Sequence, residues 1–249
     1  MTKKKLVLGL GKTGQSCINF FVKNNINFKA FDTRNKNSID ISSHHNQNLS
    51  QYRFGDYEEN FLDDVNEAII SPGINAEHKI INKINELSIP LTTDIELCGK
   101  YSKTPIIAIT GTNGKTTTVS MLEHLLNSLS LNSLACGNNG IPILESLNNQ
   151  YDYLIVELSS YHLEYIKNIN TAVSLITNIQ EDHLERHKEY KNYLSIKKRI
   201  FLNCDYALCN INLKNDMDDI KNCKYYGIKK DKNHFIINNK YNDQLYLID

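Results

Sequence analysis

Residues 110–118 read Thr-Gly-Thr-Asn-Gly-Lys-Thr-Thr-Thr and lie between an apolar run, 105–109, and a helical pattern over 119–129. A glycine-rich turn between a strand and a helix lets backbone N–H groups surround phosphate oxygens, and the helix N-terminus attracts their charge. Lys115 adds a point charge, and the hydroxyl of Thr116 is suited to Mg²⁺. The segment predicts a phosphate-binding loop for a nucleoside triphosphate, made of Gly111, Thr112, Asn113, Gly114, Lys115, Thr116 and Thr117.

The loop departs from the strict pattern G-x-x-x-x-G-K-[ST], which requires a glycine where this chain has Ile109. The first glycine of the loop is therefore Gly111, and this points away from ordinary P-loop GTPases. A glycine turn that merely joins a strand to a helix is the alternative. A Gly-Lys-Thr sequence in this context makes that alternative the weaker one.

Short apolar runs alternate along the chain with longer segments in which apolar residues recur every three or four positions. Runs such as 106–109 and 153–156 are expected strands, and 117–129 and 190–202 have the spacing of helices. This alternation predicts an α/β chain with mainly parallel sheets.

A second glycine loop, Gly9-Leu10-Gly11-Lys12-Thr13-Gly14, is a full G-x-G-x-x-G. Such a loop normally follows the first strand of a nucleotide-binding unit, so each loop should begin its own sheet. We expect a Rossmann-like domain over residues 1–93 and a P-loop-type domain over 94–249.

The ligand of the first loop is left open by its sequence. Asp32 ends the next expected strand and is placed to accept a hydrogen bond from a ribose hydroxyl, as in dinucleotide sites. The same geometry holds other diphosphates, so another nucleotide diphosphate is favoured, with NAD-type binding and a turn without ligand as alternatives. Ser71-Pro72-Gly73 follows the strand 68–70 and could line the same crevice.

Two further strand ends carry groups suited to metal binding. Glu157 ends a strand in the sheet of the phosphate loop, where a Mg²⁺ ligand is expected. After the next strand, His183 could ligate a metal or orient a substrate, and Asp182 could hold its ring. The spacing of His183 and His187 is H-x-E-x-H rather than H-E-x-x-H, which argues against a metalloprotease.

Composition excludes several classes of protein. The 28 basic and 28 acidic residues cancel, which removes the charge expected of a nucleic-acid or anionic-membrane binder. No segment has the roughly 18 to 20 apolar residues that span a bilayer, and residues 1–5 do not begin a signal peptide. The six cysteines show no C-x-x-C pair and no zinc spacing, so free thiols are expected. These features predict a cytoplasmic protein.

Several short motifs occur in one order within residues 6–199. They are Gly9 to Gly14, Asp32-Thr33-Arg34, Ser71-Pro72-Gly73-Ile74, Thr110 to Thr117, Gly137-Asn138-Asn139-Gly140, Glu157-Leu158-Ser159-Ser160 and Glu181-Asp182-His183. Together they resemble the Mur ligase family. The resemblance implies ATP- and Mg²⁺-dependent amide formation in peptidoglycan precursor synthesis, in which D-glutamate is added to UDP-N-acetylmuramoyl-L-alanine through an acyl phosphate. The choice of amino acid rests on the first domain alone.

The resemblance also implies roles for single residues. Lys115 would hold the β- and γ-phosphates, Thr116 and Glu157 would hold one Mg²⁺, and His183 would serve a second metal. From its position on an expected helix alone, Lys197 would lie on a solvated face. The resemblance instead matches it to a lysine that the family carries as a carbamate, which would ligate a metal. The expected contacts of the UDP substrate are Thr13, Asp32, Thr33, Arg34, Ser71, Gly73, Asn138 and Ser159.

The chain departs from the family pattern in two places. His162 stands where the family commonly has glutamine, which puts one local contact in question. The chain stops at Asp249, whereas the family continues with the rest of its ATPase domain and a third domain that binds the amino acid. We therefore expect weak or no ligase activity from this chain alone, with a separately encoded C-terminal domain as a partner to consider.

Three alternatives differ in what they leave unexplained. A folylpolyglutamate-synthase-like ligase shares the phosphate loop but is not expected to begin with Gly9 to Gly14. An NAD-dependent oxidoreductase would leave Lys115, Glu157 and His183 without a role. A non-catalytic nucleotide-binding remnant differs from the enzyme only in turnover.

Overall fold

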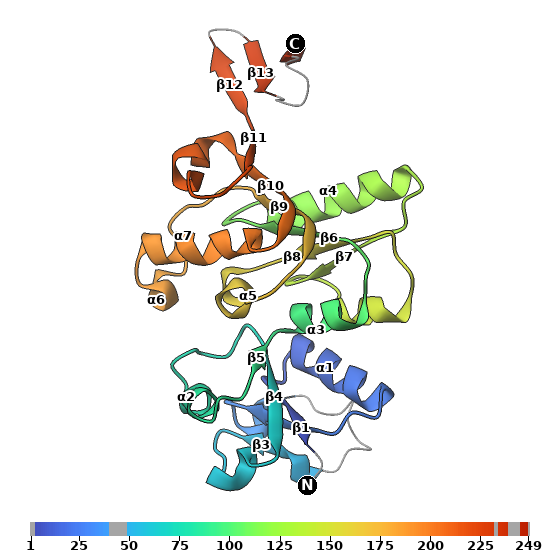
Figure 1. Cartoon of the computed structure of the whole chain (residues 1–249), viewed down its shortest axis with the longest axis vertical. Coiled ribbons are helices and arrows are strands. Elements are labelled where there is room, and N and C mark those ends of the chain that lie inside the picture. The colour runs from blue at the N-terminus through green and yellow to red at the C-terminus, as the bar shows by residue number, and fades with distance from the viewer. Residues whose placement is uncertain (1–2, 40–48, 232–233, 239–244, 249) are drawn as a thin grey trace. The chain divides into compact units, whose positions relative to one another are not determined.

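The computed structural model describes residues 3–39, 49–231, 234–238 and 245–248. The chain forms two compact units (Figure 1), the first made of Met1–Ser102 with Pro142–Asn148 and the second of Lys103–Ile141 with Asn149–Asp249. The chain therefore leaves the second unit once to complete the first. The expected domain limits, 1–93 and 94–249, stay a prediction beside these units.

The first unit is built on a five-stranded parallel sheet with the order β3-β2-β1-β4-β5. Its strands are β1 (Lys4–Leu8), β2 (Phe28–Asp32), β3 (Tyr52–Phe54), β4 (Val65–Ile70) and β5 (Leu91–Thr92). Its helices are α1 (Lys12–Lys23), α2 (Lys79–Glu86) and α3 (Asp94–Tyr101). The strand order reverses beside β1, so a crevice for a ligand is expected outside the carboxyl ends of β1 and β4.

The first glycine loop lets α1 begin directly against the end of β1. A Cβ on Gly14 would lie 1.8 Å from the carbonyl oxygen of Gly9, so no larger residue fits there. Cys17, Ile18 and Phe21 form the buried face of α1. The third glycine of the motif therefore serves the packing of helix against strand.

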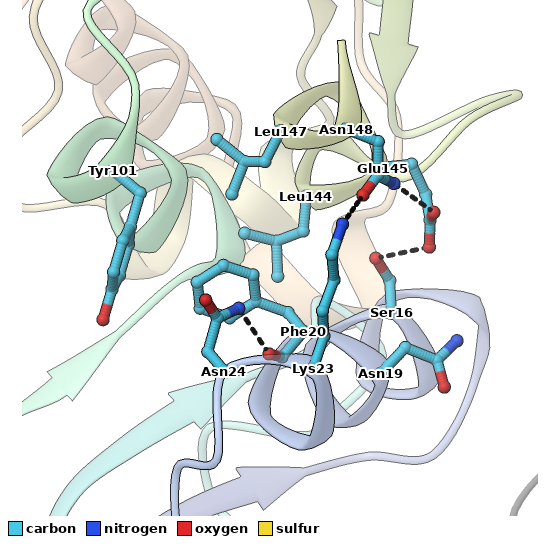
Figure 2. A pocket seen from close by; sticks show the side chains of 10 residues that line it. All are labelled: Ser16, Asn19, Phe20, Lys23, Asn24, Tyr101, Leu144, Glu145, Leu147 and Asn148. Carbon is cyan, nitrogen blue, oxygen red and sulfur yellow. Dashed lines mark hydrogen bonds between the residues drawn. The ribbon is translucent and has the colours of Figure 1, made fainter.

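Within the first unit, hydrogen bonds connect α1 to the segment Ile143–Asn148, which is a 3-10 helix. The hydroxyl of Ser16 donates to Glu145 Oε1 at 3.2 Å, and the amine of Lys23 donates to Asn148 Oδ1 at 2.5 Å. Figure 2 shows these contacts at a pocket of about 270 Å³ between α1, α3 and this segment. Ile143 and Leu144 are buried, so the segment adds to the core of the first unit.

The second unit contains a six-stranded parallel sheet with the order β11-β10-β9-β6-β8-β7. The strands are β6 (Ile106–Thr110), β7 (Ser133–Gly137), β8 (Tyr153–Glu157), β9 (Thr171–Ile176), β10 (Cys204–Asn210) and β11 (Lys224–Tyr226). The helices are α4 (Lys115–Ser128), α5 (Ser160–Tyr165), α6 (Leu184–His187) and α7 (Tyr190–Lys198). A small antiparallel sheet follows, made of β12 (Ile228–Asp231), β13 (His234–Asn238) and β14 (Leu245–Ile248).

The two parallel sheets confirm the predicted α/β class. In the second unit, Val119 of α4 packs on Ile109 of β6 and Ile155 of β8. This packing holds α4, the helix that follows the phosphate loop, against the sheet. The apolar residues of the central strands are buried because helices cover parallel sheets. No helix among the described residues is long and apolar enough to cross a membrane. Of the polar stretch 35–51, residues 40–48 lie outside the described part.

Candidate functional site

A polar pocket of about 400 Å³ lies at the carboxyl ends of β6, β7 and β8 in the second unit. These strands are neighbours, and Ile109 and Gly137 both face Glu157 in the register. Six of the seven residues predicted for the phosphate loop line the pocket, and the seventh, Gly111, precedes them in the chain. The lining residues are Thr112, Asn113, Gly114, Lys115, Thr116, Thr117, Asn138, Asn139 and Glu157.

The loop takes its shape from residues that follow β9. A Cβ on Gly111 would lie 1.9 Å from Thr177 Oγ1, so this close approach requires glycine. The Thr177 hydroxyl donates to the Asn113 carbonyl at 2.9 Å, and Asn178 Oδ1 accepts from the Asn113 N–H at 2.9 Å. Sequence reasoning did not single out Thr177 and Asn178. The one signal available was their position at a strand end beside the loop.

Lys115 begins α4 and holds its amine over the loop. Its Nζ donates to the carbonyl oxygens of Gly111 at 2.9 Å and Thr112 at 2.8 Å. Both acceptors are neutral, so a phosphate would be the stronger partner for this charge. The helix N-terminus adds positive potential at the same place.

Thr116 and Glu157 form a pair of oxygen donors at the pocket. The Thr116 hydroxyl donates to Glu157 Oε2 at 2.8 Å, and Asn138 Nδ2 donates to Glu157 Oε1 at 3.1 Å. Glu157 is 3 % exposed. A hydroxyl beside a buried carboxylate suits Mg²⁺, which takes oxygen ligands and is usually held by one or two carboxylates together with substrate phosphates.

Lys197 reaches the phosphate loop from α7. Its side chain is buried, and its Nζ donates to Thr110 Oγ1 at 3.0 Å and to the Gly111 carbonyl at 2.9 Å. Burial, with the nearby charge of Lys115, lowers the pKa of Lys197 to about 7. Its neighbour Lys198 instead forms an ion pair with Asp219 at 2.6 Å. Lys197 therefore does not lie on a solvated face of the helix, because its amine is buried beside the phosphate loop.

Asp32 organises the glycine loop at the carboxyl end of the first sheet. This carboxylate accepts from the Leu10 N–H at 2.7 Å and from the Arg34 guanidinium through two bonds of 2.9 Å. Burial alone would raise the pKa of Asp32, but these hydrogen bonds outweigh it and the pKa lies below its ordinary value. The Arg34 side chain is 52 % exposed, so part of its guanidinium faces solvent.

The other residues predicted for this crevice lie at the same end of the sheet. The Ser71 hydroxyl donates to the Gly9 carbonyl at 3.2 Å, which joins the end of β4 to the glycine loop. A Cβ on Gly73 would meet nothing within 4 Å, so its backbone faces open space. Thr13 lies in the first turn of α1 and Thr33 follows β2. Backbone and side-chain donors thus gather at this end of the sheet, and their use in binding a nucleotide diphosphate stays a prediction.

Comparison with known proteins decides the family. The model described as "Mur ligase middle domain" matches residues 109–246, and "Mur ligase MurD-like, N-terminal domain" matches residues 3–93. This chain belongs to the Mur ligase family. The resemblance drawn from the motifs is thereby confirmed.

The two relatives described next have the same name. The UDP-N-acetylmuramoylalanine--D-glutamate ligase of Buchnera aphidicola subsp. Schizaphis graminum is 39% identical over 217 residues, which are 85% of this chain and 47% of that protein. The protein with the same name from Caldanaerobacter subterraneus subsp. tengcongensis is 36% identical over 206 residues, 81% of this chain and 45% of that protein. The chain spans about half the length of the relatives it matches.

Solved Mur ligase structures share the fold. A UDP-N-acetylmuramate:L-alanyl-gamma-D-glutamyl-meso-diaminopimelate ligase from Neisseria meningitides has a TM-score of 0.58 at 15% identity and covers 95% of this chain and 84% of its own. UDP-N-acetylmuramate-alanine ligase from Thermotoga maritima has a TM-score of 0.52 at 18% identity, and the match covers 91% of this chain and 53% of that protein. None of these matches supports the oxidoreductase alternative.

Within this Mur ligase chain, His183 belongs to an aromatic cluster. Its Nδ1 is 3.1 Å from the Tyr161 hydroxyl, and its Nε2 is 3.5 Å from Asp182 Oδ2. That Asp182 holds the ring stays a prediction. The Tyr161 ring also contacts His187, whose ring contacts Tyr193. Among the described residues, the side chain of His183 contacts Tyr161, Asp182 and Glu185 rather than Thr116 or Glu157. In the same part of the chain, no group of three His, Cys, Asp or Glu side chains forms a metal site.

His162 stands where the family commonly has glutamine, and its ring forms a hydrogen bond at the start of α5. Ser159 caps α5, its hydroxyl accepts from the His162 N–H at 3.2 Å, and the His162 ring accepts in turn from the Ser159 N–H. This is a capping box in which the imidazole accepts the hydrogen bond that a glutamine side chain would otherwise accept. Burial lowers the pKa of His162 to about 4, with a smaller effect from Lys197, so the ring is neutral. Ser159 is engaged in this cap, and Asn138 in the contact with Glu157.

Proposed function

We propose that this chain is the part of an ATP-dependent ligase that binds ATP and UDP-N-acetylmuramoyl-L-alanine, in an enzyme that adds D-glutamate to this substrate in peptidoglycan precursor synthesis. The observation that carries the proposal is the pocket where Lys115, Thr116 and Glu157 meet in a Mur ligase fold. The named relatives support the choice of substrates. The proposal places the protein in the cytoplasm, where ATP is available.

In this proposal the phosphate loop binds ATP. The backbone N–H groups of residues 111–117 and the N-terminus of α4 surround the phosphates. Lys115 exchanges its two carbonyl partners for oxygens of the β- and γ-phosphates. The γ-phosphoryl group passes to the terminal carboxylate of the UDP substrate, and the amine of D-glutamate displaces phosphate from the acyl phosphate to form the amide.

Thr116 and Glu157 are the residues proposed to hold Mg²⁺. Their oxygens are 2.8 Å apart at the pocket, which fits a small cation that completes its shell with phosphate oxygens and water. The cation, when bound, offsets the negative charge of the phosphates during transfer. We propose His183 for a second metal, with Asp182 holding its ring.

Lys197 is the proposed site of carbamylation. With a pKa of about 7, a substantial fraction of this amine is neutral near neutral pH and can act as a nucleophile. Its nitrogen attacks the carbon of CO₂ and releases one proton, which leaves a carbamate with one negative charge. The cation thereby becomes an oxygen ligand close to the phosphate loop. Lys198 lacks this setting because its amine pairs with Asp219.

The UDP substrate is proposed to bind in the first unit. Arg34 presents a half-exposed guanidinium beside the crevice, held by Asp32 in a bidentate pair. An arginine fixed in this way suits a phosphate or a uracil carbonyl. The proposed contacts in the first unit are Thr13, Asp32, Thr33, Arg34, Ser71 and Gly73. Asn138 and Ser159, which belong to the second unit, are proposed separately for the rest of the sugar nucleotide.

Calorimetry with the purified chain tests this assignment. UDP-N-acetylmuramoyl-L-alanine should bind saturably, and Arg34→Ala should weaken it by about tenfold or more because a charge-assisted contact contributes roughly 1.5–3 kcal/mol. NAD is the competing ligand, and Arg53→Ala, on the outer strand β3, is the matched control. Binding of NAD in place of the UDP compound would refute the proposed substrate.

A further inference from the structure

The turn that follows β7 brings a second asparagine, Asn139, to the phosphate pocket beside Asn138. Gly137 and Gly140 stand on either side of the two asparagines and have φ angles of 107° and 85°. A Cβ on Gly137 would lie 2.5 Å from the Glu157 carbonyl oxygen, so only glycine allows the turn to approach the end of β8 this closely. The Asn138 N–H donates to the same carbonyl at 2.9 Å. The backbone therefore fixes the place of Asn139 at the pocket.

The side chain of Asn139 meets the phosphate loop at Thr116. Its Nδ2 donates to Thr116 Oγ1 at 3.5 Å, whereas the Thr116 hydroxyl donates to Glu157 Oε2 at 2.8 Å. A hydrogen bond of 3.5 Å is weak, because it is well beyond the usual N–H···O distance. Asn139 is otherwise exposed and lines the pocket. Its amide is therefore available to a ligand.

A cation bound by Thr116 would release this amide. The amide N–H carries a partial positive charge, so a cation at the same hydroxyl oxygen repels it. The amide can then donate to an anionic oxygen, which is a stronger acceptor than a hydroxyl. In a bound nucleoside triphosphate the cation lies between oxygens of the β- and γ-phosphates. We therefore expect anionic acceptors beside Thr116, where Asn139 stands.

We propose that Asn139 recognises the terminal phosphoryl group and makes the pocket favour a nucleoside triphosphate over a diphosphate. This inference rests on the proposed function, because it assigns one more residue to the same ATP site. In the free chain the amide contacts Thr116, and with ATP and Mg²⁺ bound it donates to an oxygen of the γ-phosphate. Lys115 serves the β-phosphate as well, but Asn139 has no partner in ADP.

Calorimetry with two nucleotides tests this inference without any measurement of activity. A non-hydrolysable ATP analogue and ADP, each with Mg²⁺, are titrated into wild type and into Asn139→Leu, which keeps the approximate shape of the side chain but has no donor. The affinity for the analogue should fall by about tenfold or more, as expected for the loss of one hydrogen bond to a charged group. The affinity for ADP should stay that of wild type. An equal loss for both nucleotides would overturn the inference, because it would show that Asn139 only supports the loop.

Two further variants separate the amide from the substitution itself. Asn149→Leu is the matched control, because Asn149 is an exposed asparagine of the same unit whose Nδ2 contacts the Tyr151 hydroxyl at 3.4 Å. It should bind both nucleotides as wild type does. Asn139→Gln keeps the amide donor and should recover part of the affinity for the analogue.

The same titrations distinguish this inference from the proposed function. If Asn139→Leu binds both nucleotides as wild type does, the ATP site stands and the role of Asn139 is refuted. If wild type binds neither nucleotide, the ATP site itself is refuted, and the role of Asn139 with it.

Discussion

The amine of Lys197 donates a hydrogen bond to the carbonyl oxygen of Gly111 at 2.9 Å, across 86 positions of the sequence. This contact brings a buried amine from α7 to the first residue of the phosphate loop. The same carbonyl accepts from Lys115, so two lysines share one acceptor. Their proximity is one reason why the pKa of Lys197 falls to about 7, after burial itself.

The pH dependence of stability should show this buried amine. Because the pKa of Lys197 is about 7 in the folded chain and ordinary in the unfolded chain, the unfolded state binds more protons between about pH 7 and pH 10. Wild type should therefore gain stability relative to Lys197→Met as pH rises through this range, by at most about 1.4 kcal/mol per pH unit. Urea unfolding in CO₂-free buffer measures the difference. Lys198→Met, which removes the neighbouring lysine of the same helix, is the matched control for the substitution itself. A difference between wild type and Lys197→Met that stays constant over this range would contradict the prediction.

Lys115→Ala should weaken ATP binding strongly with little effect on folding. Among the described residues the amine donates to two neutral carbonyl oxygens, whereas a phosphate contact contributes roughly 1.5–3 kcal/mol. A loss of affinity of about 10- to 100-fold is expected by calorimetry with a non-hydrolysable ATP analogue. Lys198→Ala is the control and should bind as wild type does. Equal affinities for Lys115→Ala and wild type would exclude this lysine from the nucleotide site.

Glu157→Gln should uncouple nucleotide binding from Mg²⁺. The amide keeps the size of the side chain and an oxygen for the Thr116 hydroxyl, but it removes the charge that a cation requires. Titrations with and without Mg²⁺ should differ for wild type and converge for the variant. Glu123→Gln on α4 is the control, because this residue faces the Ala135 N–H and not the pocket. A variant that responds to Mg²⁺ as wild type does would place the cation elsewhere.

Asp32→Ala should destabilise the first unit more than Arg34→Ala does. The carboxylate is buried and accepts from the Leu10 N–H, so its loss leaves a buried donor without a partner at a cost of about 1–3 kcal/mol. The Arg34 guanidinium is half exposed and can return to water. Urea unfolding compares the two variants. Equal losses of stability would show that Asp32 acts mainly through its pair with Arg34.

His162→Gln should keep the cap of α5, whereas His162→Ala should not. Loss of a cap costs about 0.5–2 kcal/mol, and glutamine is a usual partner in a capping box. The pKa of His162 is about 4 in the folded chain and higher in the unfolded chain, so wild type loses stability as pH falls from about 6.5 to about 4. Thermal unfolding at pH 7 and pH 5 should show this loss for wild type and a smaller one for His162→Gln. A more stable alanine variant at pH 7 would argue against the cap.

The sequence predicted most of what depends on neighbouring positions along the chain. The phosphate loop, the G-x-G-x-x-G turn and the alternation of strands and helices are local patterns, and the two parallel sheets confirm the fold class. The convergence of strand ends also followed, because carboxyl ends of parallel strands meet at one edge. Glu157 was predicted from its place at a strand end together with the phosphate loop in the same sheet, and it does line the pocket with Thr116, while its role as a Mg²⁺ ligand stays a prediction.

Tertiary structure decided what depends on burial and on contacts between distant segments. Only the folded chain shows that Thr177 and Asn178 shape the loop, that Ile143–Asn148 returns to the first unit, and that His162 completes a cap. Lys197 and Lys198 are neighbours with the same chemistry in the sequence, yet one is buried against Gly111 and the other pairs with Asp219. The pattern of residues specifies the types of element, but desolvation and the nearest charges specify the chemistry of each side chain, and both arise only when the elements pack.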